Sequence, residues 1–94
     1  MIKSFRCEAT ETLFRRIPTR EFPKVIHRVA LRKLAMIDAA VELTDLRVPP
    51  GNRLEKLAGD RKGQYSIRIN DHWRICLIWK EGQAHQVEIT KHYE

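Results

Sequence analysis

The sequence predicts an α+β domain in which two N-terminal helices pack on a small, twisted antiparallel sheet. The first observation is an amphipathic pattern over residues 24–41, where apolar side chains recur at helical spacing. The second is a change of period after residue 64. Apolar and polar residues alternate over 65–70 and again over 73–79, as in strands with one buried face. Because the chain has 94 residues, we expect a single domain spanning 1–94.

The other expected elements are short. They are a first strand at 2–7, a helix at 8–16, a helical turn at 43–46, a loop at 49–52 and a last strand around Val87. Pro18 ends the first helix, since the residue before a proline disfavours helical backbone. Thr44 is placed to cap the helical turn. The order is therefore β-α-α-β-β-β, with helices early and strands late.

The alternation also predicts the register of the central hairpin. A three-residue loop at 70–72 places both apolar sets on one face by pairing Ile69 with Trp73 and Arg68 with Arg74. Two arginines would then lie opposite each other on the outer face, where like charges destabilise a sheet. An anionic ligand is expected there. Trp73 and Trp79 fall at the core-facing positions of the alternation. They are therefore interpreted as packing residues rather than platforms for base stacking.

Charge and composition limit the function classes. The net charge is +6 and the pI about 9.8, which favours a polyanionic partner, nucleic acid first; excess cations that only maintain solubility are the alternative. Two cysteines, Cys7 and Cys76, suggest neither a disulfide framework nor a zinc site, so a reducing cytoplasm is expected. Four scattered histidines predict no metal site, and no cofactor is expected. No signal peptide or membrane span is apparent.

Five stretches of the sequence carry a further pattern: 1–5, 34–40, 45–46, 49–54 and, most of all, 59–75. Together they resemble the HigB branch of the RelE-type bacterial toxins, the killer proteins of plasmid-maintenance toxin–antitoxin modules. The resemblance covers essentially the whole chain. It implies a small ribonuclease that enters the ribosomal A site and cleaves mRNA there. It also implies a helix-turn-helix antitoxin of the HigA type, which blocks the toxin and through which operator DNA is bound.

Metal-free RNA cleavage needs a base for the 2′-hydroxyl, cations for the phosphate and an acid for the leaving 5′-oxygen. Arg74, facing outward from a central strand, is the first candidate for the phosphate, because its planar fork suits bidentate contact. Arg68 is the second. A solvated strand arginine paired with a carboxylate is the alternative for Arg74, while Arg68 could instead contact the antitoxin or ribosomal RNA.

The acid and base candidates are Glu55, His92 and Tyr93. Members of the family often carry a histidine near the position of Glu55 and an Asp-Tyr-His-like tail, and this sequence departs from both. Glu55 could act as a base, or it could balance neighbouring cations on an exposed strand. His92 titrates in the useful range and has the parity of the polar face. Tyr93 points the opposite way unless the tail bends.

Further cations are expected to contact the RNA backbone. They are Arg53, Lys56, Arg61, Lys62 and Lys91. A solvated turn explains Arg61 and Lys62 equally well. The sequence thus predicts the toxin of a type II toxin–antitoxin module, a ribosome-dependent mRNA endoribonuclease that inhibits translation. The alternatives are a non-catalytic module that binds RNA or the ribosome, and an antitoxin-binding protein that acts mainly in operon control.

Overall fold

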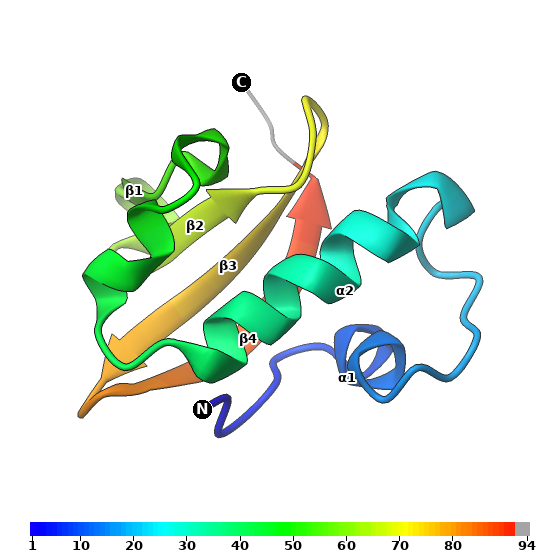
Figure 1. The fold of residues 1–94 in the computed structure, drawn as a ribbon, viewed down its shortest axis with the longest axis horizontal. Coiled ribbons are helices and arrows are strands. Elements are labelled where there is room, and N and C mark those ends of the chain that lie inside the picture. The colour runs from blue at the N-terminus through cyan, green and yellow to red at the C-terminus, as the bar shows by residue number, and fades with distance from the viewer. Residues whose placement is uncertain (92–94) are drawn as a thin grey trace.

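A computed structural model describes residues 1–91 and shows two α-helices packed against a four-stranded antiparallel sheet (Figure 1). The predicted α+β class is confirmed. The strands are β1 (Glu55–Lys56), β2 (Tyr65–Arg68), β3 (Trp73–Lys80) and β4 (Gln83–Lys91), and they neighbour one another in that order. Within residues 1–91, no helix is long and apolar enough to span a bilayer.

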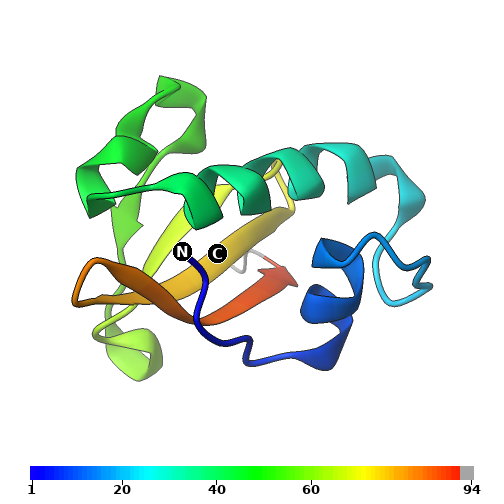
Figure 2. The same ribbon diagram turned by 60° about the horizontal axis from the view of Figure 1, so that its bottom comes forward.

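The long helix α2 (Lys24–Ala39) lies across one face of the sheet and supplies much of the core (Figure 2). Its buried apolar face contains Ile26, Ala30, Leu34 and Ile37, at the spacing that the sequence predicted. The helix ends two residues earlier than expected, because the backbone of Ala40 is extended. Lys33 is buried on the same helix, with 5% of its surface exposed.

The short helix α1 (Glu8–Phe14) packs against α2 and β4. It buries Leu13 and Thr10, whose hydroxyl oxygen accepts a hydrogen bond from the backbone N–H of Ile89 at 3.0 Å. The predicted helix at 8–16 is two residues too long, since Arg16 leaves helical geometry with a φ of +62°. Cys7, which we expected in or beside a strand, immediately precedes α1.

The predicted register of the central hairpin is confirmed. Arg68 pairs with Arg74, and the backbone N–H of Ile69 donates to the carbonyl of Trp73 at 2.8 Å across the loop 70–72. β4 begins at Gln83, earlier than the expected strand around Val87. The β3–β4 ladder shifts register near Gln86, which has a φ of +50° and forms a bulge.

The expected first strand at 2–7 is wrong as a full strand. Two isolated bridges, Ile2 with Ala84 and Phe5 with Val87, attach this segment parallel to β4. The backbone N–H of Ile2 also donates to the Asp38 carboxylate at 2.8 Å. Ile2 and Phe5, the two residues that form the bridges, are partly buried against the core.

Two 3₁₀ turns lead from α2 into the sheet, η1 (Leu43–Arg47) and η2 (Pro50–Asn52), and a third, η3 (Gly59–Arg61), connects β1 to β2. η1 is capped by a reciprocal box of Glu42 and Asp45, so the expected cap at Thr44 is wrong. Asn52 is completely buried, and its side-chain amide donates to the carbonyls of Leu46 at 3.1 Å and Val48 at 3.4 Å. These bonds hold η1 and η2 together beside β1.

Candidate active site

A polar cleft opens at the loop end of the β2–β3 hairpin and extends toward β1. Its volume is about 580 Å³. The side chains that line it come from both strands, their loop and the segment before β2: Arg53, Glu55, Ser66, Arg68, Asn70, Asp71, His72, Trp73 and Arg74. Four of the residues that the sequence singled out, Arg53, Glu55, Arg68 and Arg74, therefore meet in one place.

Arg68 and Arg74 face each other across the ladder, and Thr90 of β4 continues the same row. The Arg68 guanidinium forms an ion pair with the carboxylate of Asp71. This pairing offsets part of the repulsion between the two arginines. Arg68 also holds the pKa of Asp71 below its usual range, through a hydrogen bond and its charge.

Arg74 lacks such a partner at one of its nitrogens. Its Nε is buried and has no hydrogen-bond acceptor among residues 1–91. Among the side chains of these residues, one other buried polar atom lacks a hydrogen-bond partner, the side-chain oxygen of Asn52. An unsatisfied buried donor costs about 1–3 kcal/mol, and more when it is charged. Arg74 also lines the cleft, where an anion can approach its side chain.

A buried lysine fixes the backbone behind the cleft. The Lys33 ammonium on α2 donates a hydrogen bond to the backbone carbonyl of Arg68. β1 pairs only with Tyr65 and Ser66, so it offers this carbonyl no partner. Burial, then the charges of Arg32 and Arg68, lower the pKa of Lys33. Lys33 therefore ties the end of β2 to the long helix.

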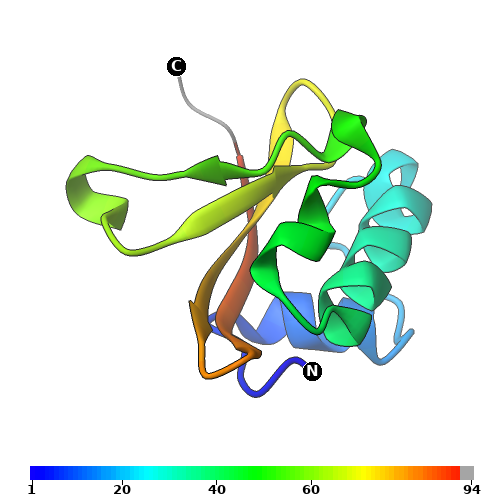
Figure 3. The ribbon, with the colours of Figure 1, turned by 60° about the vertical axis from the view of Figure 1, so that its left-hand side comes forward.

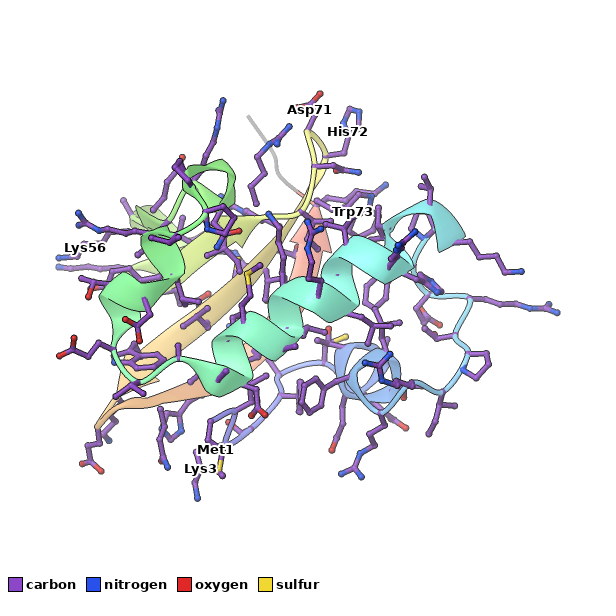
Figure 4. All side chains as sticks on the ribbon, in the orientation of Figure 1. Met1, Lys3, Lys56, Asp71, His72 and Trp73 are labelled. Carbon is purple, nitrogen blue, oxygen red and sulfur yellow. The ribbon has the colours of Figure 1, made fainter. Side chains whose placement is uncertain are left out.

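The β2–β3 loop brings His72 into the cleft. The Asn70 side-chain oxygen accepts hydrogen bonds from the backbone N–H groups of His72 at 2.8 Å and Trp73 at 2.9 Å, which closes a tight turn. Figure 4 shows Asp71 and His72 at the tip of this hairpin. Sequence reasoning gave His72 no role. Its place two residues before Arg74, after an asparagine suited to this turn, was the available signal.

Trp73 lies between the core and the cleft. Its ring packs edge-on against Phe22 with centroids 5.8 Å apart, and the Lys91 ammonium lies 5.6 Å from the ring centroid. The predicted packing role is confirmed in part, because the same side chain also forms cleft wall. Trp79 is half-buried against the core.

Other residues that the sequence singled out lie elsewhere. Lys56 extends from the side of the sheet away from the hairpin tip (Figure 4), and Lys62 is exposed after η3. That turn belongs to the β1–β2 arm, which projects from the body in Figure 3. His92 and Tyr93 lie outside the described residues. Among residues 1–91 there is no group of three His, Cys, Asp or Glu side chains that could hold a metal ion.

Arg61 is engaged on the outer face of the sheet. Its guanidinium donates to Glu88 at 2.9 Å and to the Gln64 side-chain oxygen at 3.0 Å. Cys76, on the same face, is fully buried, and this burial raises the pKa of its thiol. The alternation had predicted an open polar face here. The contacts of Arg61 instead cover the centre of this face, and the face stays open at the loop end of the β2–β3 hairpin.

Over residues 3–92 the chain matches the family of HigB-like toxins, described as the RelE-like toxin of type II toxin–antitoxin system HigB. The chain belongs to this family. The match covers nearly the whole sequence and confirms the resemblance drawn from the five stretches above. The three arginines and Glu55 of the cleft therefore belong to a RelE-like toxin domain.

Two relatives show how far the similarity extends. Toxin HigB-1 of Vibrio cholerae is 42% identical over 73 residues, which is 78% of this chain and 77% of the relative. Endoribonuclease HigB of Proteus vulgaris is 35% identical over 86 residues, 90% of this chain and 91% of the relative. The similarity to both relatives therefore extends over most of the length of this toxin.

The fold is also found in a solved structure. A chain of the YoeB–YefM complex from Staphylococcus aureus superposes with a TM-score of 0.62 over 99% of each chain, at 17% identity. This similarity supports the RelE-like fold. It includes the sheet on which the toxin presents Arg68 and Arg74.

Chemically, the cleft of the toxin combines cations with groups that can exchange protons. Arg53, Arg68 and Arg74 provide positive charge from three neighbouring segments, and Glu55 and His72 line the same space. Arginine forks on sheet strands are well suited to a phosphate group. A carboxylate and an imidazole are groups that move protons in general acid–base catalysis.

Proposed function

We propose that this toxin is a ribosome-dependent mRNA endoribonuclease that inhibits translation in the cytoplasm. The observation that carries the proposal is the Arg68–Arg74 pair, whose two residues face each other across the β2–β3 ladder and line one cleft with Arg53. A phosphodiester supplies the negative charge and the acceptor oxygens that such a pair needs. The relationship to Endoribonuclease HigB of Proteus vulgaris supports RNA as the substrate.

In the proposed reaction the 2′-oxygen of one nucleotide bonds to the adjacent phosphorus, and the bond from phosphorus to the 5′-oxygen breaks. Arg74 and Arg68 stabilise the charge on the crowded phosphate. Glu55 accepts the proton of the 2′-hydroxyl, and His92 protonates the leaving 5′-oxygen, with Tyr93 as a further proton donor. The products are a 2′,3′-cyclic phosphate and a 5′-hydroxyl. No metal takes part in this scheme.

The cleft and its surroundings suit a single strand of RNA. Its volume of about 580 Å³ lies within the range of roughly 300–1,000 Å³ found for ligand sites. Arg53 lines the cleft with the arginine pair, and the Lys91 ammonium lies over the ring of Trp73, which forms part of the cleft wall. Lys56, Arg61 and Lys62 lie farther along the chain's basic surface, where we propose contacts with the RNA backbone or the ribosome.

The partner that restrains the toxin is proposed to be a helix-turn-helix antitoxin of the HigA type. Membership of a type II toxin–antitoxin family supports this partner. A chain of the YoeB–YefM complex has the same fold as this toxin, which further supports an antitoxin partner. Operator DNA is bound through the antitoxin rather than by the toxin itself.

Primer extension on translated mRNA tests the proposal. Induction of the chain should arrest growth and produce cleavage stops in translated messages, and co-expression of the antitoxin should remove both. Arg74→Ala should produce no stops. Lys80→Ala is the matched control, because it removes an exposed cation from the far end of the same strand and should cleave normally.

A non-catalytic ribosome-binding module remains the second candidate. It is favoured by the departure at Glu55, where the family often has histidine, and by the altered tail. Growth arrest without cleaved message, from a chain that still sediments with ribosomes, would support this second reading and reject the first.

A further inference from the structure

We infer that the groove between α1 and α2 binds an acidic, amphipathic segment of the cognate antitoxin. The inference rests on the proposed antitoxin partner and names the surface that it uses. The groove has a volume of about 470 Å³ and shares no lining residue with the RNA cleft. Its lining residues are Leu13, Arg16, Ile17, Pro18, Thr19, Arg20, Lys24, His27 and Leu31.

The floor of the groove is apolar. Leu13, Ile17, Pro18 and Leu31 come from α1, the following loop and α2. Ile17 keeps 52% of its surface exposed, and it lines the groove together with the buried Leu13. An apolar floor of this kind favours an amphipathic protein segment that can bury its own aliphatic residues.

The rim is positively charged. Arg16, Arg20 and Lys24 line it, and none of the lining residues is a carboxylate. This contrasts with the RNA cleft, where Glu55 and Asp71 accompany the arginines. A partner with acidic residues around an apolar stripe would complement this surface in charge and in polarity.

The floor also argues against RNA as the occupant. Single-stranded RNA is held by aromatic rings on which bases stack, together with cations along the backbone. The groove lining contains no tryptophan, tyrosine or phenylalanine. Its imidazole is engaged, since His27 is hydrogen-bonded through Nε2 to the carbonyl of Phe22 at 2.9 Å.

The backbone at the rim holds Arg16 in a left-handed conformation at the end of α1. The N–H of Arg16 donates to Leu13 at 2.8 Å and the N–H of Ile17 donates to Thr12 at 3.1 Å, which is a Schellman end for α1. Glycine is the residue usually found at the left-handed position of this motif, yet here it is an arginine with a φ of +62°. An arginine in this conformation is less stable than a glycine would be, so the position can be tested without loss of stability.

The left-handed backbone gives a variant in which stability and binding change in opposite directions. Arg16→Gly should melt at the same temperature as the wild type or higher, because glycine relieves the strain. Its affinity for the antitoxin should fall about fivefold, as for loss of a rim charge. Lys24→Glu should weaken binding further, and Ile17→Asp should weaken it at least about tenfold, by placing a charge on the apolar floor.

Val25→Asp is the matched control. Val25 is 82% exposed, follows Lys24 on α2 and does not line the groove, so this change should leave affinity within about twofold of the wild type. Affinities would be measured by calorimetry with the purified cognate antitoxin, and circular dichroism would confirm that each variant is folded.

Two results would overturn the inference. One is wild-type antitoxin affinity in folded Arg16→Gly, Lys24→Glu and Ile17→Asp proteins. The other is weaker binding to ribosomes or RNA with unchanged antitoxin affinity, which would make the groove a nucleic-acid contact. Because these measurements do not use cleavage, the inference can hold even if the toxin proves to have no nuclease activity.

Discussion

Lys33 on the long helix donates a hydrogen bond to the backbone carbonyl of Arg68, at the point where β2 ends and the cleft begins. The lysine is buried, and its ammonium partners a carbonyl that β1 is too short to reach. A positive charge is therefore held behind a cleft that already contains several arginines. The hydrogen bond from Lys33 helps to fix the backbone of Arg68, and the burial of Lys33 disfavours the charged form of its amine.

Stability should therefore depend on pH through Lys33. Folding lowers its pKa, so between the folded value and the usual 10.5 the unfolded chain binds more protons than the folded chain. The free energy of unfolding should rise with pH across that window, and the full cost of the charge applies below it. Urea unfolding from pH 7 to 10 should show this rise in the wild type relative to Lys33→Met. Parallel pH profiles for the two proteins would contradict it.

Asn52 should be important for the wall that carries Arg53 and Glu55. Its buried amide donates to two carbonyls of the preceding turns, and Asn52→Ala would leave both without that donor. The variant should lose about 1–3 kcal/mol of unfolding free energy. Thr44→Ala, an exposed change in the same segment, should stay within about 0.5 kcal/mol. Urea titration compares them, and equal effects would show that the amide contributes little.

RNA binding should weaken steeply with salt, and two cleft variants should change the slope in opposite directions. Arg74→Ala removes one phosphate contact and should make the slope of log K against log salt shallower by about 1. Asp71→Asn frees Arg68 from its ion pair and should steepen the slope and tighten binding at low salt. Asp60→Asn lies outside the cleft and is the control. Filter binding measures all three, and a flat slope in the wild type would reject phosphate recognition.

The hairpin register could be predicted because period-two alternation fixes which residues share a face. The arginine pair followed from that register, and so did most of the cleft. The first strand could not be predicted reliably, since two apolar residues specify a strand too weakly. Its bridges depend on where β4 lies, and a sequence pattern does not contain that information.

The ion pair of Arg61 and the burial of Lys33 could not be predicted from the sequence either. Both depend on partners far along the chain: Glu88 is 27 residues from Arg61, and Arg68 is 35 residues from Lys33. His72 was overlooked for a different reason. Its entry into the cleft depends on the turn that the Asn70 side chain closes, and the alternation of the flanking strands gives no sign of it.

The chemical role of Arg74 can be tested by substitution. If its guanidinium stabilises the transition state, Arg74→Ala should abolish measurable cleavage while the melting temperature stays the same or rises, because the change also removes the buried Nε that has no acceptor. Arg74→Lys should restore little activity, since an ammonium cannot reproduce the bidentate fork. His92→Ala should lower the rate by about 10²-fold if the imidazole transfers a proton.

The product ends and the effect of chelators complete this test. Cleavage by 2′-hydroxyl attack leaves 2′,3′-cyclic or 3′-phosphate ends, which resist poly(A) polymerase until a phosphatase removes them. Chelators should not slow the reaction, because the proposed scheme uses arginines where a metal-dependent nuclease uses its ion. Products with 3′-hydroxyl ends, or full activity in folded Arg74→Ala, would rule out this mechanism and leave the toxin as a ribosome-binding module.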